Sequence, residues 1–314
     1  MPVIDSIIQA ATGKVAEVTL GGQGRRTVTV GGEAALPFLT FEGQMPHRPV
    51  VAVDVEDREP TTWAGTLRDA WGAAAKDPAT WARAAVEAGA DAIALTLAST
   101  HPDRENASPE SAVETVKQVL AAVDVPLIVY GPGVAAKDNE VLVAVADATQ
   151  GAGLALGVCE DKNYRTIVAA SLANGHVAIA KTPIDLNLAK QLNILIADMG
   201  LPPDRILMDP TTGALGYGLE YTYSVMERLR LAALQGDRWC AMPMICTVGY
   251  EAWRQKESRV GEGVPAEWGD LARRGILWEA TTASTLLQAG ADVLVMRHPQ
   301  AIALVRGAID KLMG

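Results

Sequence analysis

The stretch that decides the fold reads RILMDPTTGALGYGLEYTYSVMERLRLAALQGDRWCAMPMICTVGYEAW, residues 205–253. A short apolar run, Ile206 to Met208, is followed by a glycine-broken loop, a helical pattern over Tyr221 to Leu234, and a second apolar run, Met242 to Cys246. Buried strand, loop, amphipathic helix and buried strand in this order are typical of a parallel sheet covered by helices. Such folds bind ligands just past the carboxyl ends of their strands. The polar residues after each run therefore predict a site.

The same order recurs along the chain. The expected strands are Val50 to Asp54, Ala92 to Leu97, Leu127 to Tyr130, Leu154 to Gly157, Val177 to Ile179, Ile206 to Met208, Met242 to Cys246 and Val293 to Met296. The helices that follow them are expected near Ala79 to Ala88, Pro109 to Val123 (with Ser108 as its N-cap), Asp138 to Ala148, Tyr164 to Ala173, Leu186 to Met199, Tyr221 to Leu234, Leu271 to Gln288 and Ala301 to Met313. Eight such pairs in about 265 residues match the ~250 residues typical of a closed (β/α)8 TIM barrel. Because no Rossmann glycine fingerprint is present, the barrel is favoured over an open doubly wound sheet.

A segment before the first barrel strand falls outside this order. Val15 to Leu20 and Arg26 to Val30 are alternating β segments joined by Gly21-Gly22-Gln23-Gly24, which predicts a β-hairpin. No helix with Lys-Ser/Thr follows these glycines, so a turn is favoured over a phosphate-binding loop. The hairpin is expected to close the N-terminal mouth of the barrel or to offer an edge to a partner. We therefore divide the chain into a hairpin segment, residues 1–48, and a barrel, residues 49–314.

Composition narrows the class of protein. A chain of 314 residues with 49% hydrophobic residues can bury one large core. The net charge of −10 argues against a nucleic-acid surface. No apolar run is long enough to cross a bilayer, and the N-terminus lacks the basic start and apolar core of an export signal. The three cysteines have no short spacing, which favours a reducing cytoplasm.

Two connections are far longer than the ~2–6 residues usual for βα loops. They run from Glu56 to Asp77 and from Gly249 to Asp270, both after the carboxyl ends of expected strands. Their large side chains are Trp63, Trp71, Tyr250, Trp253, Arg254 and Trp268. Aromatic residues in two loops at one mouth favour a binding face for a bulky molecule. The alternative is extra packing over the ring of helices.

Titratable residues at strand ends are the candidates for chemistry. They are Asp54, Glu56, Glu160, Lys181, Asp185, Asp209 and His298. Lys181 could be a Schiff-base nucleophile if desolvated, but an ion pair with Asp209 or Asp185 is the favoured interpretation. Asp209, before Pro210, is expected to accept backbone N–H groups and fix the loop that follows.

Cys159, Cys246 and His298 could together bind zinc, although buried thiols are the more common state of cysteines without a local motif. No pair of nucleophile and base stands out. The rim is instead rich in threonine, glycine, tyrosine and backbone amides. These groups suit the binding of a large polar cofactor better than proton transfer.

Several longer blocks carry a resemblance to a known family. They are GGEAALPF (31–38), FEG (41–43), PIDLNLAKQLNILI (183–196), DPTTGALGYGLEY (209–221), MERLRLAALQGD (226–237), MPMICTVGYEAW (242–253), GILWEATTASTLLQAGA (275–291) and LVMRHP (294–299). With these blocks the chain resembles the small subunit of corrinoid iron–sulfur proteins, also called the delta subunit of acetyl-CoA decarbonylase/synthase. The blocks run from the expected hairpin to the last helix, so the resemblance covers nearly the whole chain.

The resemblance implies a TIM barrel in a heterodimer of the reductive acetyl-CoA (Wood–Ljungdahl) pathway. The large subunit of such a pair carries a [4Fe–4S] cluster and a cobalamin-binding domain, and the corrinoid sits between that domain and the C-terminal mouth of the barrel. A methyl group passes from methyltetrahydrofolate, through a methyltransferase, to acetyl-CoA synthase. This chain has too few cysteines for a four-cysteine cluster and no DxHxxG-type histidine for cobalt. The resemblance thus implies a subunit without catalytic residues or metal ligands of its own.

The rim after the sixth and seventh strands is the predicted corrinoid contact. The residues are Thr211, Thr212, Gly213, Gly216, Tyr217, Thr247 and Tyr250. Glycine lets the backbone approach a flat macrocycle, and hydroxyl or amide groups can meet its propionamide arms. Two other functions stay open. One is a pterin-dependent methyltransferase on the same fold, which could hold the pterin with Asp54, Asp209 and Glu160. The other is a lyase built on Lys181 or on the cysteines and histidine.

Overall fold

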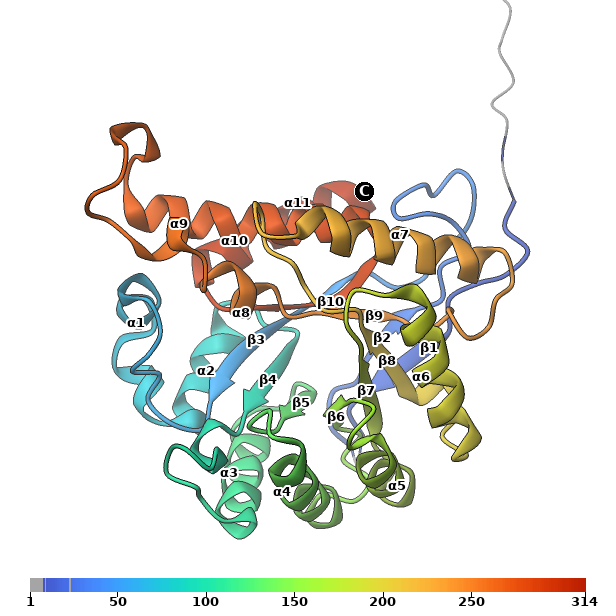
Figure 1. Cartoon of the computed structure of the whole chain (residues 1–314), viewed down its shortest axis with the longest axis horizontal. Coiled ribbons are helices and arrows are strands. Elements are labelled where there is room, and N and C mark those ends of the chain that lie inside the picture. The colour runs from blue at the N-terminus through green and yellow to red at the C-terminus, as the bar shows by residue number, and fades with distance from the viewer. Residues whose placement is uncertain (1–7, 9, 23) are drawn as a thin grey trace, which may run out of the picture.

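The computed structural model describes residues 8, 10–22 and 24–314, and its body is a closed barrel of parallel strands (Figure 1). The order around the barrel is β10-β3-β4-β5-β6-β7-β8-β9, so the last strand pairs with the first. The strands are β3 (Val50–Glu56), β4 (Ala92–Thr96), β5 (Leu127–Tyr130), β6 (Ala155–Cys159), β7 (Val177–Lys181), β8 (Ile206–Asp209), β9 (Met244–Cys246) and β10 (Ala291–Met296). The predicted (β/α)8 barrel is confirmed, and every expected barrel strand is present with small differences at its ends.

Helices cover the outside of the barrel (Figure 1). The long ones are α2 (Pro78–Glu87), α3 (Pro109–Ala122), α4 (Ala135–Ala148), α5 (Tyr164–Asn174), α6 (Leu186–Asp198), α7 (Leu219–Leu234), α10 (Leu271–Gln288) and α11 (Pro299–Met313). Several begin at a polar side chain that accepts a backbone N–H three residues later, as Asp77, Ser108 and Asp270 do. The predicted cap at Ser108 is therefore confirmed. Within the described residues, each helix is too short or too polar to span a bilayer.

The two long connections are folded rather than open loops. They contain α1 (Gly65–Trp71), η1 (Gly72–Lys76), α8 (Val248–Ala252), α9 (Lys256–Arg259) and η4 (Ala266–Trp268), and further short turns are η2 (Ala98–Thr100) and η3 (Pro203–Arg205). Trp63 and Trp71 pack against Trp81 of α2, with ring centroids 5.2 and 6.1 Å from it. All three rings are buried. For these tryptophans the packing interpretation is correct, and they do not line an open binding face.

The predicted hairpin closes one end of the barrel. Strands β1 (Glu17–Leu20) and β2 (Val28–Gly31) pair antiparallel, and Val18, Leu20 and Val30 are buried in the apolar cluster inside the barrel. The N–H of Gly21 donates to the carbonyl of Gly153 at 2.8 Å, just before β6. The first of the two expected roles, closure of the N-terminal mouth, is thus confirmed. Residues 1–7, 9 and 23 of the proposed segment 1–48 lie outside the described residues, and the domain boundary at residue 48 stays a prediction.

Side chains inside the barrel form layers, because successive strand residues face alternately inward and outward. The lower layers are apolar. With the hairpin residues they contain Val50, Ala52, Ala92, Ala94, Ile128, Ala155, Val177, Ile179, Leu207, Ile245, Val293 and Val295. The same alternation brings the next inward residue of each strand to the C-terminal mouth. There the side chains become polar.

Candidate functional site

A ring of polar side chains fills the C-terminal mouth of the barrel. On seven of the eight strands, counting two residues onward from an inward apolar position leads to its members, and on β6 the same count leads to Gly157. The members are Asp54, Thr96, Tyr130, Lys181, Asp209, Thr247 and Arg297. We call this set the polar ring. Its hydrogen bonds divide it into a half whose groups bond to one another and a half with unmatched groups.

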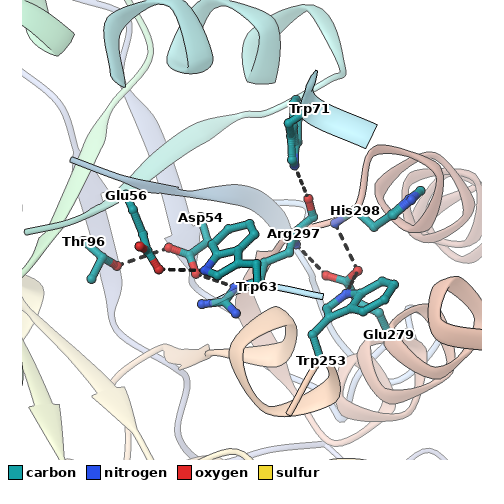
Figure 2. Close-up of polar contacts among 9 residues, drawn as sticks. All are labelled: Asp54, Glu56, Trp63, Trp71, Thr96, Trp253, Glu279, Arg297 and His298. Carbon is teal, nitrogen blue, oxygen red and sulfur yellow. Dashed lines mark hydrogen bonds and ion pairs between the residues drawn. The ribbon is translucent and has the colours of Figure 1, made fainter. Parts of the chain in front are cut away.

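The closed half of the polar ring is centred on Arg297. Its Nε donates to Asp54 at 2.7 Å, and Thr96 donates to the other oxygen of the same carboxylate at 3.1 Å. The guanidinium carbon lies 4.0 Å from the centroid of the Trp63 ring. Trp63 in turn donates to Glu56 at 2.7 Å, as Figure 2 shows. Burial and the neighbouring Asp54 raise the pKa of Glu56.

A third buried carboxylate, Glu279 of α10, holds the backbone after β10. It accepts the N–H groups of Arg297 and His298 at 2.5 and 3.1 Å, and the indole N–H of Trp253 at 2.7 Å (Figure 2). Trp71 closes the arrangement by donating to the carbonyl of Arg297 at 2.8 Å. Burial raises the pKa of Glu279 to about 7. Both long connections are therefore attached to the residues that follow β10, the first directly through Trp71 and the second through Trp253 and Glu279.

The open half of the polar ring contains buried groups without partners. Tyr130 Oη and Asp209 Oδ2 of the ring, and Thr182 Oγ1 directly after Lys181, are buried atoms without a hydrogen bond to any described residue. Asp209 is almost fully buried, and burial raises its pKa even though Lys181 opposes the shift. Burial, together with Asp209 and Asp54, raises the pKa of Tyr130 far above its usual value. Such atoms gain a hydrogen bond when a water or a ligand supplies one.

Asp209 fixes the loop that follows it, as predicted. Its Oδ1 accepts the N–H of Thr211 at 2.9 Å. The expected ion pair of Lys181 is not formed: within the described part of the chain no carboxylate lies within 4.0 Å of its ammonium group. Asp185 instead caps α6 by accepting the N–H of Leu188 at 2.9 Å. Lys181 and Asp209 are opposite each other on β7 and β8, so they interact at longer range.

Three of the predicted corrinoid contacts hold the loop after β8 together. Thr211 adopts a positive φ of 64° and donates to the carbonyl of Thr182 at 2.6 Å. Thr212 accepts the N–H of Thr247 at 2.9 Å. A Cβ on Gly213 would meet the carbonyl oxygen of Gly218 at 2.4 Å. Glycine at 213 is thus required by the loop itself.

The other predicted contacts reach the surface. Gly216 is exposed with φ 74°, and Tyr217 is half exposed and donates to Glu257 at 3.3 Å. Thr247 is partly exposed in the polar ring. Tyr250 is half exposed, and its ring lies 5.4 Å from the Arg297 guanidinium. The contact of these residues with a corrinoid stays a prediction.

The cysteines and His298 do not form a metal site. Cys159 of β6 and Cys246 of β9 belong to the apolar cluster between the strands and the surrounding helices. The sulfur of Cys246 lies 3.7 Å from the sulfur of Met226. His298 caps α11 by accepting the N–H of Gln300, and its ring stacks on Trp253. Burial lowers the pKa of His298 to about 4. Across the described residues, no group of three histidine, cysteine or acidic side chains could hold a metal ion.

Several members of the site were not singled out from the sequence. Thr96, Tyr130 and Arg297 each end or directly follow an apolar strand, and alternation from the apolar positions before them would have identified all three. Glu279 gave no such signal. It lies in the middle of a helix, and only the tertiary fold brings it against the end of β10.

Comparisons with known proteins agree on one family. A family profile described as CO dehydrogenase/acetyl-CoA synthase delta subunit matches residues 17–306. The acetyl-CoA decarbonylase/synthase complex subunit delta of Methanopyrus kandleri is 40% identical over 95% of this chain and 75% of that protein. The subunit of the same name from Archaeoglobus fulgidus is 39% identical over 96% of this chain and 69% of that protein.

Solved structures share the fold. A dihydropteroate synthase from Stenotrophomonas maltophilia has a TM-score of 0.56 at 14% identity, covering 85% of this chain and 92% of that chain. The enzyme from Thermus thermophilus has a TM-score of 0.55 at 16% identity, covering 94% and 98%. At these identities the likeness concerns the barrel alone.

Proposed function

The chain belongs to the CO dehydrogenase/acetyl-CoA synthase delta subunit family, and from that membership we propose that it is the small subunit of a heterodimeric corrinoid iron–sulfur methyl carrier. Its barrel covers one face of a corrinoid held by the large subunit, which also carries the [4Fe–4S] cluster. A methyl group passes from methyltetrahydrofolate, through a methyltransferase, to acetyl-CoA synthase. We expect the complex in the cytoplasm, where the three buried free cysteines stay reduced.

The observation that carries the proposal is the chemistry of the mouth. The polar ring has unmatched hydroxyl and carboxyl groups. Its hydroxyl–carboxylate pair of Thr96 and Asp54 is held by Arg297, which bonds the other oxygen of the same carboxylate. Such a mouth can bind and orient another molecule, and the ion pair with Arg297 ties up the carboxylate that would otherwise activate the Thr96 hydroxyl. A subunit that holds a cofactor for its partner needs only to bind and orient that cofactor.

The residues present fit a corrinoid, which supplies a cobalt ion that can carry a methyl group. The half-exposed ring of Tyr250 lies beside Arg297 of the polar ring, and Thr247 of the ring is partly exposed, as are Thr211 and Tyr217 in the loop after β8. Flat rings can lie against a macrocycle, and hydroxyls can bond its amide arms. Tyr250 is held between Arg254 and Arg297, whose guanidinium carbons lie 5.0 and 5.4 Å from its ring centroid. These two contacts favour the orientation that the ring has in the structure.

Co-expression with the large subunit tests the proposal. Sedimentation should show a 1:1 heterodimer that contains cobalt, with an interface of ~2,000 Å² or more if the partnership is obligate. Tyr250→Ala should lower the cobalt content of the purified complex. The control Tyr221→Ala removes a more exposed tyrosine that is outside the predicted contacts, and it should leave cobalt unchanged. A chain that stays monomeric beside the large subunit would refute the proposal.

A pterin-dependent methyltransferase is the second candidate. The unmatched Asp209 oxygen favours it, because a carboxylate inside a barrel mouth can accept N–H groups of a heterocycle. Asp54, the other ring acid expected to hold a pterin, already bonds Arg297 and Thr96. Titration of the isolated chain with methyltetrahydrofolate separates the two functions. Saturable binding without the large subunit would support the methyltransferase.

A further inference from the structure

A pocket of about 300 Å³ lies beside the open half of the polar ring, between the ends of β6 and β7 and the helix α6. Its walls differ in chemistry. Apolar side chains of α6 form one wall and polar residues after the two strands form the other. The lining includes Leu188, Leu192 and Leu195 on the apolar side and Glu160, Lys181 and Thr182 on the polar side. The leucines recur at the spacing of one helix face, so the apolar wall follows from the sequence of α6.

The unpartnered hydroxyl of Thr182 indicates that the pocket has a ligand. The backbone of Thr182 is engaged, because its N–H donates to the carbonyl of Asp209 at 3.1 Å and its own carbonyl accepts the hydroxyl of Thr211 at 2.6 Å. The side chain is 7% exposed, and its hydroxyl has no partner in the described residues. A buried hydroxyl without a hydrogen bond destabilises the fold unless another molecule supplies one. The neighbouring Lys181 ammonium is also outside any ion pair of the described chain.

The charges around the pocket select the kind of group that fits. The lining contains two acids, Glu160 and Asp161, and two lysines, Lys162 and Lys181. A bound anion would meet the acids and a bound cation the lysines, so neither is favoured at short range. A neutral group that both donates and accepts hydrogen bonds can use both signs. The leucine wall further requires an apolar part next to that group.

We propose that this pocket binds a neutral amide carried on an apolar body. The Lys181 ammonium donates to the amide oxygen, the Glu160 carboxylate accepts from the amide nitrogen, and the Thr182 hydroxyl bonds the same group from the buried side. The source of this amide rests on the function proposed above: it is an amide arm of the corrinoid. The pocket would then extend the contact beyond the rim after β8 and β9 to β6, β7 and α6.

Three small molecules that share a phenyl ring test the class of ligand. They are titrated into the full-length chain without the large subunit. Benzamide should bind more tightly than benzoate or benzylamine in a titration followed by NMR. Thr182→Val removes an unpartnered hydroxyl, so it should keep or raise the melting temperature while weakening benzamide binding about tenfold. Equal affinity for the three probes, or for parent and variant, would overturn the proposal.

Thr149→Val is the matched control. Thr149 is as buried as Thr182, but its hydroxyl donates to the carbonyl of Val145 at 2.7 Å. It precedes the N-terminal end of β6, whereas the pocket lies past the carboxyl end of that strand. This variant should lower the melting temperature and leave benzamide binding unchanged. A loss of benzamide affinity equal to that of Thr182→Val would show an effect on the fold as a whole and would contradict a local site.

The assembled heterodimer tests the source of the amide. Thr182→Val should weaken binding of hydroxocobalamin about tenfold, and a hydroxocobalamin with an arm amide hydrolysed to carboxylate should be bound less tightly by the parent. Corrinoid binding independent of Thr182 would overturn the corrinoid arm as the source. Failure of the heterodimer to form would instead refute the proposed function, and the benzamide titration of the isolated chain would still decide the ligand class.

Discussion

At the scale of single residues, Arg297 holds the closed half of the polar ring. It pairs with Asp54 at 2.7 Å, and both side chains are nearly buried. Arg297→Met leaves the Asp54 carboxylate buried without its cation, which should cost about 3–5 kcal/mol of unfolding free energy. Urea denaturation measures the loss. The exposed pair of Arg254 and Glu251 gives the control, since Arg254→Met should cost no more than about 1 kcal/mol. Similar losses in both variants would contradict a special role for Arg297.

The raised pKa of Glu279 predicts that the stability of the fold depends on pH. Its pKa in the folded chain is about 7, above the value of 4.5 for a free glutamate. The folded state therefore holds a proton that the unfolded state releases, and stability falls as the pH rises from about 5 to about 7. Glu279→Gln abolishes this titration. The melting temperature of the parent should exceed that of the variant by more at pH 5 than at pH 8, and parallel profiles would refute the shift.

At the scale of elements, the hairpin is part of the barrel core. Leu20 is fully buried among the lower apolar layers. Leu20→Ala should cost about 2–5 kcal/mol of unfolding free energy, as large-to-small changes in cores do. Leu312→Ala is the control, because that leucine is 36% exposed and its truncation should change stability by about 0.5 kcal/mol or less. A small effect at Leu20 would mean that the hairpin is an attached arm and that the barrel is closed without it.

At the scale of the whole molecule, the two ends of the barrel have different tasks. The hairpin covers the N-terminal end, and the polar ring opens at the C-terminal end. If the large subunit and its corrinoid cover the C-terminal end, hydrogen exchange should slow in residues 57–77, 210–218 and 247–270 on assembly. Exchange in the strands of the hairpin, 17–20 and 28–31, should stay the same. Protection confined to the hairpin would place the partner at the opposite end.

The barrel could be predicted from the sequence because its signals are local. Apolar runs such as Leu127 to Tyr130 and amphipathic helices such as Leu271 to Gln288 carry their periodicity within a few residues. Alternation also determines which strand residues face inward, so the polar ring is implied once the apolar layer is known. The role of Asp209 in fixing its loop followed in the same way, from a carboxylate and a proline at a strand end.

The pairing of the polar groups was decided only by the tertiary structure. Arg297 bonds Asp54 across a sequence separation of 243 residues, and Glu279 reaches the end of β10 from a neighbouring helix. Lys181 instead stays without the ion pair expected for it, although Asp209 is its neighbour in the sheet. The physical reason is that a hydrogen bond forms only when the donor–acceptor distance is right to within a few tenths of an ångström and the donor points toward the acceptor. Sequence alone determines which groups reach the mouth, whereas packing in three dimensions determines which of them remain free to bind another molecule.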